Sequence, residues 1–236
     1  MSTDPIALDA PSAVGDAPRA LVSWSGGKDS ALALQRVLAD GRVRVDGLLT
    51  TLTDEYDRIS MHGVRRALLE AQAAALGLPL ELVRIPPACS NADYEAASRA
   101  ALERYAARGG EAVVFGDLYL ADIRAYRERL LATVPLGARF PLWLEDTAAL
   151  ARRFVADGFR AVLVCVDPAQ LDPRFAGRAY DDALLDALPP GVDPCGENGE
   201  FHTFVHDGPI FRRPVSVRAG ETVERGGFVF ADLLPG

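Results

Sequence analysis

The single lysine of this 236-residue chain, Lys28, lies in the segment Ser-Gly-Gly-Lys-Asp-Ser at residues 25–30. The other 24 of its 25 basic residues are arginines, so a lysine at this position indicates a need for an ammonium group. An apolar stretch precedes the segment and a stretch of helical composition follows it. Adjacent glycines let a backbone turn tightly against an anion, and the start of a helix points N–H groups at the same place. The pattern therefore predicts a loop that holds phosphate.

The polar side chains of this loop fit that chemistry. Ser25 and Ser30 can donate hydroxyl hydrogen bonds, and Lys28 supplies a full positive charge. Asp29 would repel phosphate, so we expect it to help hold Mg²⁺ or to tether the loop backbone. The spacing differs from the kinase-type GxxxxGK[ST] loop and from GxGxxG, which leaves a nicotinamide or flavin site without support.

A second cluster of reactive side chains lies in residues 193–209, Asp-Pro-Cys-Gly-Glu-Asn-Gly-Glu-Phe-His-Thr-Phe-Val-His-Asp-Gly-Pro. Within seven consecutive positions, 197–203, the chain carries Glu197, Glu200, His202 and Thr203 among glycine turns. If residues 200 to 202 are extended, Glu200 and His202 face the same side. There they could bind a metal or transfer a proton to an incoming amine.

Single residues of this cluster also have ordinary structural explanations. Asn198-Gly199 alone is typical of a hairpin turn. His202 and His206 lack an evident third ligand, so the pattern does not favour zinc, and we predict no metal held by these side chains alone. Cys195 alone fits a small buried residue, because a nucleophilic thiol needs a nearby base.

Alternating apolar and helical stretches must position the two clusters. The expected strands cover residues 20–24, 43–49, 80–85 and 111–115, and the expected helices cover 30–38, 64–76, 92–108 and 122–132. This alternation predicts an α/β fold, a parallel sheet with crossover helices on both faces. Gly116 and Asp117 follow the fourth strand, so they should face the same crevice as the phosphate loop.

The second half of the chain has a different pattern. We expect a short segment near Phe140, a helix at 146–156, a strand at 161–166, and short strands and turns in the last 40 residues. The predicted parts are a flexible N-terminal tail (1–18), a domain that contains the phosphate loop (19–150) and a smaller C-terminal domain (151–236), with the boundary somewhere between residues 134 and 168.

Composition excludes several classes of protein. The formal net charge of −8 and the pI of about 5.0 argue against general nucleic-acid binding. No apolar run reaches the ~20 residues of a membrane helix, and the N-terminus lacks the features of a signal peptide. Three separated cysteines without a CxxC pair exclude a disulfide scaffold and a zinc ribbon. We therefore expect a soluble, cytoplasmic protein without a membrane partner; homo-oligomerisation stays open.

Together the two clusters resemble a known family. SGGKDS is similar to the pyrophosphate loop (PP-loop) of the N-type ATP pyrophosphatases, and GENGEFHTFVxDGP resembles the hallmark of the diphthine–ammonia ligase family and its bacterial relatives. Other similar segments are Met61-His62-Gly63, AQAAALGLPL at 71–80, Val114–Asp117, Pro141-Leu142-Trp143 and Gly177-Arg178. The resemblance implies a HUP-like doubly wound parallel sheet with a smaller C-terminal α+β domain. The alanine- and arginine-rich composition fits a bacterial member.

The resemblance also implies an activity: ATP adenylates a carboxylate, and ammonia then displaces AMP to form an amide. The pyrophosphate end of ATP would be held by Ser25, Gly26, Gly27, Lys28, Asp29 and Ser30, with Gly116 and Asp117 facing them. Catalytic roles would fall to Lys28, Asp29, Glu197, Glu200 and His202. Substrate or ammonia would be bound by Asn198, Glu200, His202 and Thr203. ATP is thus the implied co-substrate, and ATP chemistry implies Mg²⁺.

Several alternatives stay open. The carboxylate is unknown, and it is diphthine on an elongation factor only if the organism makes that residue. A non-catalytic adenine-nucleotide sensor and a PP-loop ATP pyrophosphatase with a different acceptor, such as a tRNA thiolase, are the other hypotheses. Met61-His62-Gly63 borders the nucleotide, or His62 only caps the following helix. Arg124 and Glu128 lie one helical turn apart and fit a solvated ion pair.

Overall fold

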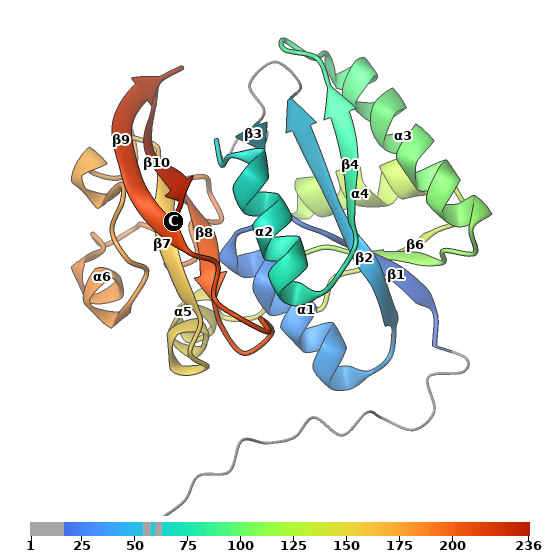
Figure 1. Ribbon diagram of the computed structural model, residues 1–236, viewed down its shortest axis with the longest axis horizontal. Coiled ribbons are helices and arrows are strands. Elements are labelled where there is room, and N and C mark those ends of the chain that lie inside the picture. Colours follow the sequence, from blue (N-terminus) through green and yellow to red (C-terminus); the bar gives the residue numbers. More distant parts are fainter. Residues whose placement is uncertain (1–16, 54–57, 60–62) are drawn as a thin grey trace, which may run out of the picture.

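A computed structural model describes residues 17–53, 58–59 and 63–236 of the chain. It contains two sheets with helices between them and on their outer faces (Figure 1). Most of the predicted N-terminal tail, and the predicted nucleotide-bordering residues Met61 and His62, lie outside the described residues.

The larger sheet is built from the first half of the chain. Its strands are β1 (Arg19–Ser23), β2 (Arg44–Thr53), β3 (Arg58–Ile59), β4 (Leu80–Ile85), β5 (Ala112–Val114) and β6 (Gly137–Arg139). Strand β2 pairs in parallel with β4 and β1, β1 with β5, and β5 with β6, whereas β3 is antiparallel to the end of β2. The chain therefore adds β2 and then β4 on one side of β1, and later returns to place β5 on the other side of β1. Ligands of such sheets bind at the carboxyl ends of the strands where this reversal occurs.

Helices cover both faces of this sheet, which confirms the predicted doubly wound α/β fold (Figure 1). They are α1 (Lys28–Asp40), α2 (Arg66–Leu76), α3 (Asn91–Ala107) and α4 (Ala121–Leu131). On one face, Leu102 of α3 and Leu131 of α4 pack with Leu21 and Val113 of the sheet. On the other face, α1 and α2 lie between the two sheets and contact strands β8 (Phe201–Asp207) and β10 (Phe228–Pro235) of the smaller one, respectively. None of the helices in the described ranges is both long and apolar enough to span a membrane.

The smaller sheet is antiparallel, in the order β8-β7-β10-β9. Its elements, with the helices that accompany them, are α5 (Thr147–Ala156), β7 (Arg160–Val166), η2 (Pro173–Phe175), α6 (Asp182–Ala187), β8 (Phe201–Asp207), β9 (Val217–Arg225) and β10 (Phe228–Pro235). The prediction of short strands in the last 40 residues was wrong, because β9 and β10 have nine and eight residues. Gly226 and Gly227 both have positive φ and form the tight two-residue turn of a long hairpin.

The division between the two parts falls at a connecting segment. The predicted boundary after residue 150 would cut helix α5, whose Leu150 and Phe154 pack in the core of the smaller sheet. Phe154 stacks on Phe159 and meets Tyr180 edge-on. We therefore propose that residues 140–146, between β6 and α5, separate the two parts.

Candidate active site

The phosphate loop lies at the reversal point of the larger sheet, directly after β1. Gly116 follows β5, the strand next to β1, and approaches the start of α1 very closely. A Cβ on Gly116 would lie 2.8 Å from the carbonyl carbon and oxygen of Asp29. The absence of a side chain at residue 116 therefore lets the two strand ends converge on one crevice, as the sequence predicted for Gly116 and Asp117.

The loop itself is held by its own serines and by a strand of the smaller sheet. Gly26 has φ +78°, a conformation that favours glycine, and its carbonyl accepts a hydrogen bond from Val205 N at 2.9 Å. Ser25 Oγ accepts from Gly27 N at 3.2 Å and lies 3.3 Å from Ser30 Oγ. Ser30 Oγ in turn donates to the Gly27 carbonyl at 2.8 Å. These bonds shape the turn and keep both hydroxyls in the crevice.

A buried glutamine that was not predicted as a site residue also fixes this loop. Gln72 of α2 is fully buried and donates from Nε2 to the carbonyls of Gly26 (3.0 Å) and Val205 (2.6 Å). Its Oε1 accepts from Trp24 Nε1 at 2.9 Å. Gln72 thus joins α2, the loop and β8. The sequence placed Gln72 in a predicted helix, and only the fold shows which groups surround it.

Replacing Gln72 with alanine should lower the free energy of unfolding by about 3 kcal/mol, since Trp24 and Val205 lose buried hydrogen-bond partners and a cavity forms. Urea denaturation followed by circular dichroism measures this value. Gln35→Ala is the matched control, because the side-chain hydrogen bond of Gln35 in the described part of the chain is to Asp157 at the surface. Equal stability of the two variants would contradict the role given to Gln72.

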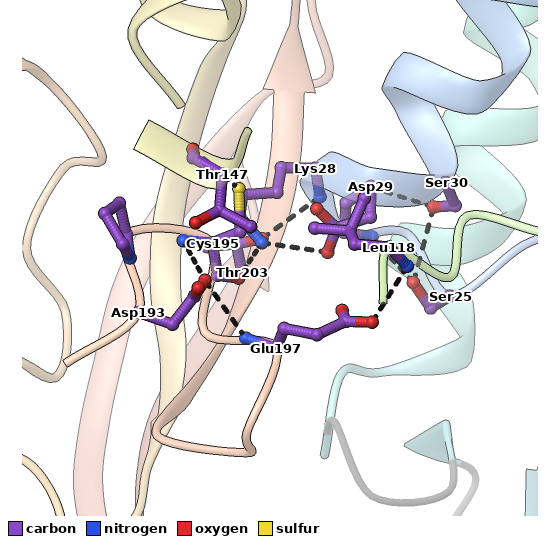
Figure 2. Close-up of polar contacts among 12 residues, drawn as sticks. Ser25, Lys28, Asp29, Ser30, Leu118, Thr147, Asp193, Cys195, Glu197 and Thr203 are labelled. Carbon is purple, nitrogen blue, oxygen red and sulfur yellow. Dashed lines mark hydrogen bonds and ion pairs between the residues drawn. The ribbon is translucent and has the colours of Figure 1, made fainter. Parts of the chain in front are cut away.

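Lys28 is almost completely buried, and its ammonium group is held by residues from both parts of the chain (Figure 2). Nζ donates to Asp29 Oδ2 at 2.8 Å and to the carbonyl of Cys195, and it lies 5.7 Å from the centre of the Phe201 ring. Burial opposes the charged form, but Asp29, Cys195 and Glu197 together outweigh it, and the pKa of Lys28 lies above its ordinary value. Lys28 is therefore a fixed cation in the crevice.

Two aspartates, Asp29 and Asp117, line the same cavity as this cation. Asp29 Oδ1 is buried and has no hydrogen-bond partner among the described residues. Burial raises the pKa of Asp117, partly offset by Arg127, whose Nε lies 3.9 Å from Asp117 Oδ2. The described ranges hold no group of three or more acidic, histidine or cysteine side chains arranged for a metal. An unpartnered carboxylate oxygen next to a phosphate loop does fit Mg²⁺, which binds through one or two carboxylates plus substrate phosphates.

Glu200 organises the second cluster rather than facing the crevice. Its buried carboxylate accepts hydrogen bonds from Asp193 N (2.9 Å), Asn198 N (3.0 Å) and Asn198 Nδ2 (3.1 Å). Strand β8 begins only at Phe201, so the extended run needed to place Glu200 and His202 on one side is absent. His202 lines the cavity at the loop, whereas Glu200 and Asn198 do not. The exposed Asn198 instead accepts a hydrogen bond from Tyr119 at 3.0 Å.

Replacing Glu200 with glutamine should loosen the turn that carries the Cys195 carbonyl, because an amide NH₂ would meet converging N–H donors. We expect a melting temperature several degrees lower and a raised KM for ATP, with kcat changed less than about tenfold. Exposed Glu221→Gln is the control. A large loss of kcat at an unchanged melting temperature would instead place Glu200 in the chemistry.

Glu197, His202 and Thr203 are the members of the cluster that reach the crevice. Glu197 Oε1 accepts from Leu118 N at 2.8 Å, and burial raises the pKa of Glu197 to about 7 (Figure 2). Burial, together with Lys28, lowers the pKa of His202 to about 4, so its imidazole is neutral at pH 7. Thr203 Oγ1 accepts from Lys28 N at 3.1 Å. Of these groups, Glu197 titrates closest to neutral pH.

Two adjoining cavities open at this place. The smaller, about 240 Å³, is lined by most of the loop, by Asp117, and by Cys195–Glu197, Gly199 and Phe201–Thr203. The larger, about 750 Å³, lies at the carboxyl ends of β1, β2, β4 and β5. They share Ser23, Ser25, Phe115 and Arg127. The sequence did not mark Arg127, whereas Arg124 and Glu128 form an ion pair at 2.8 Å on the surface, as expected.

The organisation of the chain matches one protein family along most of its length. The model of the diphthamide synthase N-terminal domain matches residues 18–136, and that of the C-terminal domain matches residues 146–231. The chain belongs to the diphthamide synthase family. The two matched regions flank residues 137–145, a stretch that overlaps the proposed connection between the two parts of this diphthamide synthase family member.

Similar curated proteins carry the name diphthine–ammonia ligase. The one from Danio rerio is 29% identical, with 89% of this chain and 90% of the relative covered. Those from Rattus norvegicus and Homo sapiens are 27% and 25% identical, each with 89% of this chain and 86% of the relative covered. The family expected from SGGKDS and GENGEFHTFVxDGP is thereby confirmed.

Proposed function

We propose that this diphthamide synthase family member is an ATP-dependent ligase that converts a carboxylate into an amide. In the first step, a carboxylate oxygen attacks the α-phosphorus of ATP, and pyrophosphate leaves. In the second step, ammonia attacks the acyl carbon, AMP leaves, and one proton is released. The observation that carries the proposal is the buried ammonium of Lys28 at the reversal point of the sheet, beside two adjoining cavities.

The cavities suggest how ATP binds. The pyrophosphate end occupies the smaller cavity, where Lys28 and the hydroxyls of Ser25 and Ser30 contact it. The nucleoside occupies the larger cavity, which has the size of a small-molecule site. Asp29 and Asp117 would hold Mg²⁺, which would supply positive charge to neutralise the departing pyrophosphate. Lys28 stabilises the same charge from the side of the smaller sheet.

Glu197 acts as the base toward the attacking amine. As ammonia attacks the acyl carbon, its nitrogen becomes positively charged, and the Glu197 carboxylate takes a proton from it. A pKa of about 7 suits a group that must be ionised before the step and hold a proton after it. His202, neutral in this pH range, orients the acceptor by hydrogen bonding. Glu200 positions Glu197 and the Cys195 carbonyl through its contacts with the turn.

The names of the relatives suggest the first acceptor to test. They are called diphthine–ammonia ligases, so diphthine on a protein is the leading candidate for the carboxylate. A different carboxylate that undergoes the same reaction is the second candidate. The 750 Å³ cavity leaves room for an acceptor beside the nucleoside.

The proposal is tested by product analysis. Purified protein, ATP, Mg²⁺, ammonium and a diphthine-bearing acceptor should form AMP, pyrophosphate and amide in equal amounts. An isotopic label in the carboxylate oxygen should appear in AMP, because that oxygen bridges the acyl and phosphoryl groups. Formation of ADP and phosphate, or the absence of any affinity for ATP, would refute the ligase. Tight ATP binding without AMP formation from any carboxylate would favour a nucleotide sensor.

A further inference from the structure

The guanidinium group of Arg127 on α4 lies at the junction of the two cavities. Of the four residues that line both cavities, Ser23, Ser25, Phe115 and Arg127, only the last carries a charge. Its guanidinium carbon lies 5.4 Å from the centre of the Phe115 ring, so the side chain is held over an aromatic face. The position of this charge at the end of β5 is therefore defined.

The hydrogen bonding of Arg127 is incomplete. Nε is buried and has no hydrogen-bond partner in the described parts of the chain. The nearest carboxylate oxygen, Asp117 Oδ2, is 3.9 Å away, which is too far for a hydrogen bond. A buried N–H without an acceptor is costly and calls for an explanation, such as a bound ligand. An anion at the junction would supply the missing acceptor.

We infer that Arg127 binds the α-phosphate of the nucleotide. This inference rests on the proposed function, in which ATP spans both cavities. The α-phosphate joins the ribose to the pyrophosphate, so it must lie where the nucleoside cavity meets the phosphate cavity. Arginine suits this position because its planar fork can donate two hydrogen bonds to phosphate oxygens. The same contacts would stabilise the additional charge on the α-phosphorus as the carboxylate attacks.

Calorimetric titration of the full chain with AMP, pyrophosphate and adenosine tests this assignment. Arg127→Gln should weaken AMP binding about 10- to 100-fold, since a charge-assisted hydrogen bond is lost. Binding of adenosine and pyrophosphate should change less than about threefold, because neither contains an α-phosphate ester. Arg127→Lys should weaken AMP binding by an intermediate amount, because lysine keeps the positive charge but lacks the planar fork of the guanidinium group. Arg129→Gln, exposed on the same helix, should bind all three ligands normally.

The outcomes separate this inference from the proposed function. Normal AMP binding by Arg127→Gln overturns the inference alone. Equal losses for AMP and adenosine also overturn it, because Arg127 would then only shape the nucleoside cavity. Failure of the unmodified protein to bind AMP, pyrophosphate or adenosine would overturn both the proposed function and the inference. A selective loss of AMP binding at an unchanged melting temperature supports the assignment.

Discussion

Replacing Lys28 with methionine should lower kcat/KM for ATP by at least about 10²–10³-fold. The ammonium group is the buried cation nearest to the predicted pyrophosphate, and removal of one such stabilising donor typically has an effect of this size. Pyrophosphate binding should weaken in parallel, whereas adenosine binding should change little. Steady-state kinetics and calorimetry measure these effects. Turnover close to the unmodified level would contradict the phosphate role of the loop.

The control for this prediction must separate chemistry from folding. Loss of Lys28 leaves the Asp29 carboxylate buried beside an uncharged side chain, which is destabilising in itself. The double variant Lys28→Met/Asp29→Asn removes both charges while keeping similar side-chain volumes. We expect its melting temperature to recover relative to Lys28→Met, while turnover stays lost. Recovery of both would show that the lysine acts only by balancing Asp29.

Replacing Glu197 with glutamine should lower the rate of amide formation by about 10²–10⁴-fold and flatten its pH profile. In the unmodified protein the rate should rise with pH and level off above about 7, as the Glu197 carboxyl loses its proton. Adenylation should be much less affected, because Glu197 acts on the amine. The exchange of pyrophosphate into ATP measures the rate of adenylation. The profile is measured at a constant concentration of unprotonated ammonia, so that the protonation of ammonia itself does not enter it.

The pH dependence of protein stability tests the raised pKa of Glu197 independently of activity. Burial raises the folded pKa of Glu197 from 4.5 to about 7, so the folded state binds more protons than the unfolded state between these values. The contribution of Glu197 to stability is therefore present below pH 4.5 and is lost as the pH rises to about 7. Relative to the unmodified protein, Glu197→Gln should be more stable at pH 8 than at pH 5. Exposed Glu128→Gln is the control and should show no such difference.

The sequence was most informative where local rules decide the structure. Gly26 must adopt positive φ, and Gly116 must leave room for the Asp29 backbone. Both needs are typical of a loop and a strand end that surround phosphate, so the phosphate crevice and the doubly wound sheet could be predicted. Apolar strands that alternate with helices then place both glycines at the same edge.

The remaining features depend on contacts between distant segments. Gln72 lies 46 residues from Gly26 and 133 residues from Val205 along the chain, and no local pattern predicts that its amide group hydrogen-bonds to both. Arg127 is one arginine among 24, and only the junction of the two cavities distinguishes it. Glu200 was expected beside His202 on the condition that residues 200 to 202 are extended, whereas the chain bends at Glu200 and β8 begins at Phe201. A residue outside the strand does not follow its alternation of sides, so this carboxylate is placed by its contacts with the turn.

The contacts of Lys28 also bear on when the protein becomes able to bind nucleotide during its synthesis. Its backbone N–H and its ammonium group are held by Thr203 and Cys195, which are 175 and 167 residues further along the chain. A nascent polypeptide that has exposed only the first sheet therefore lacks the partners that order this lysine. The enzyme would remain inert on the ribosome until the strand carrying Thr203 emerges and docks, so a truncated translation product could not consume ATP.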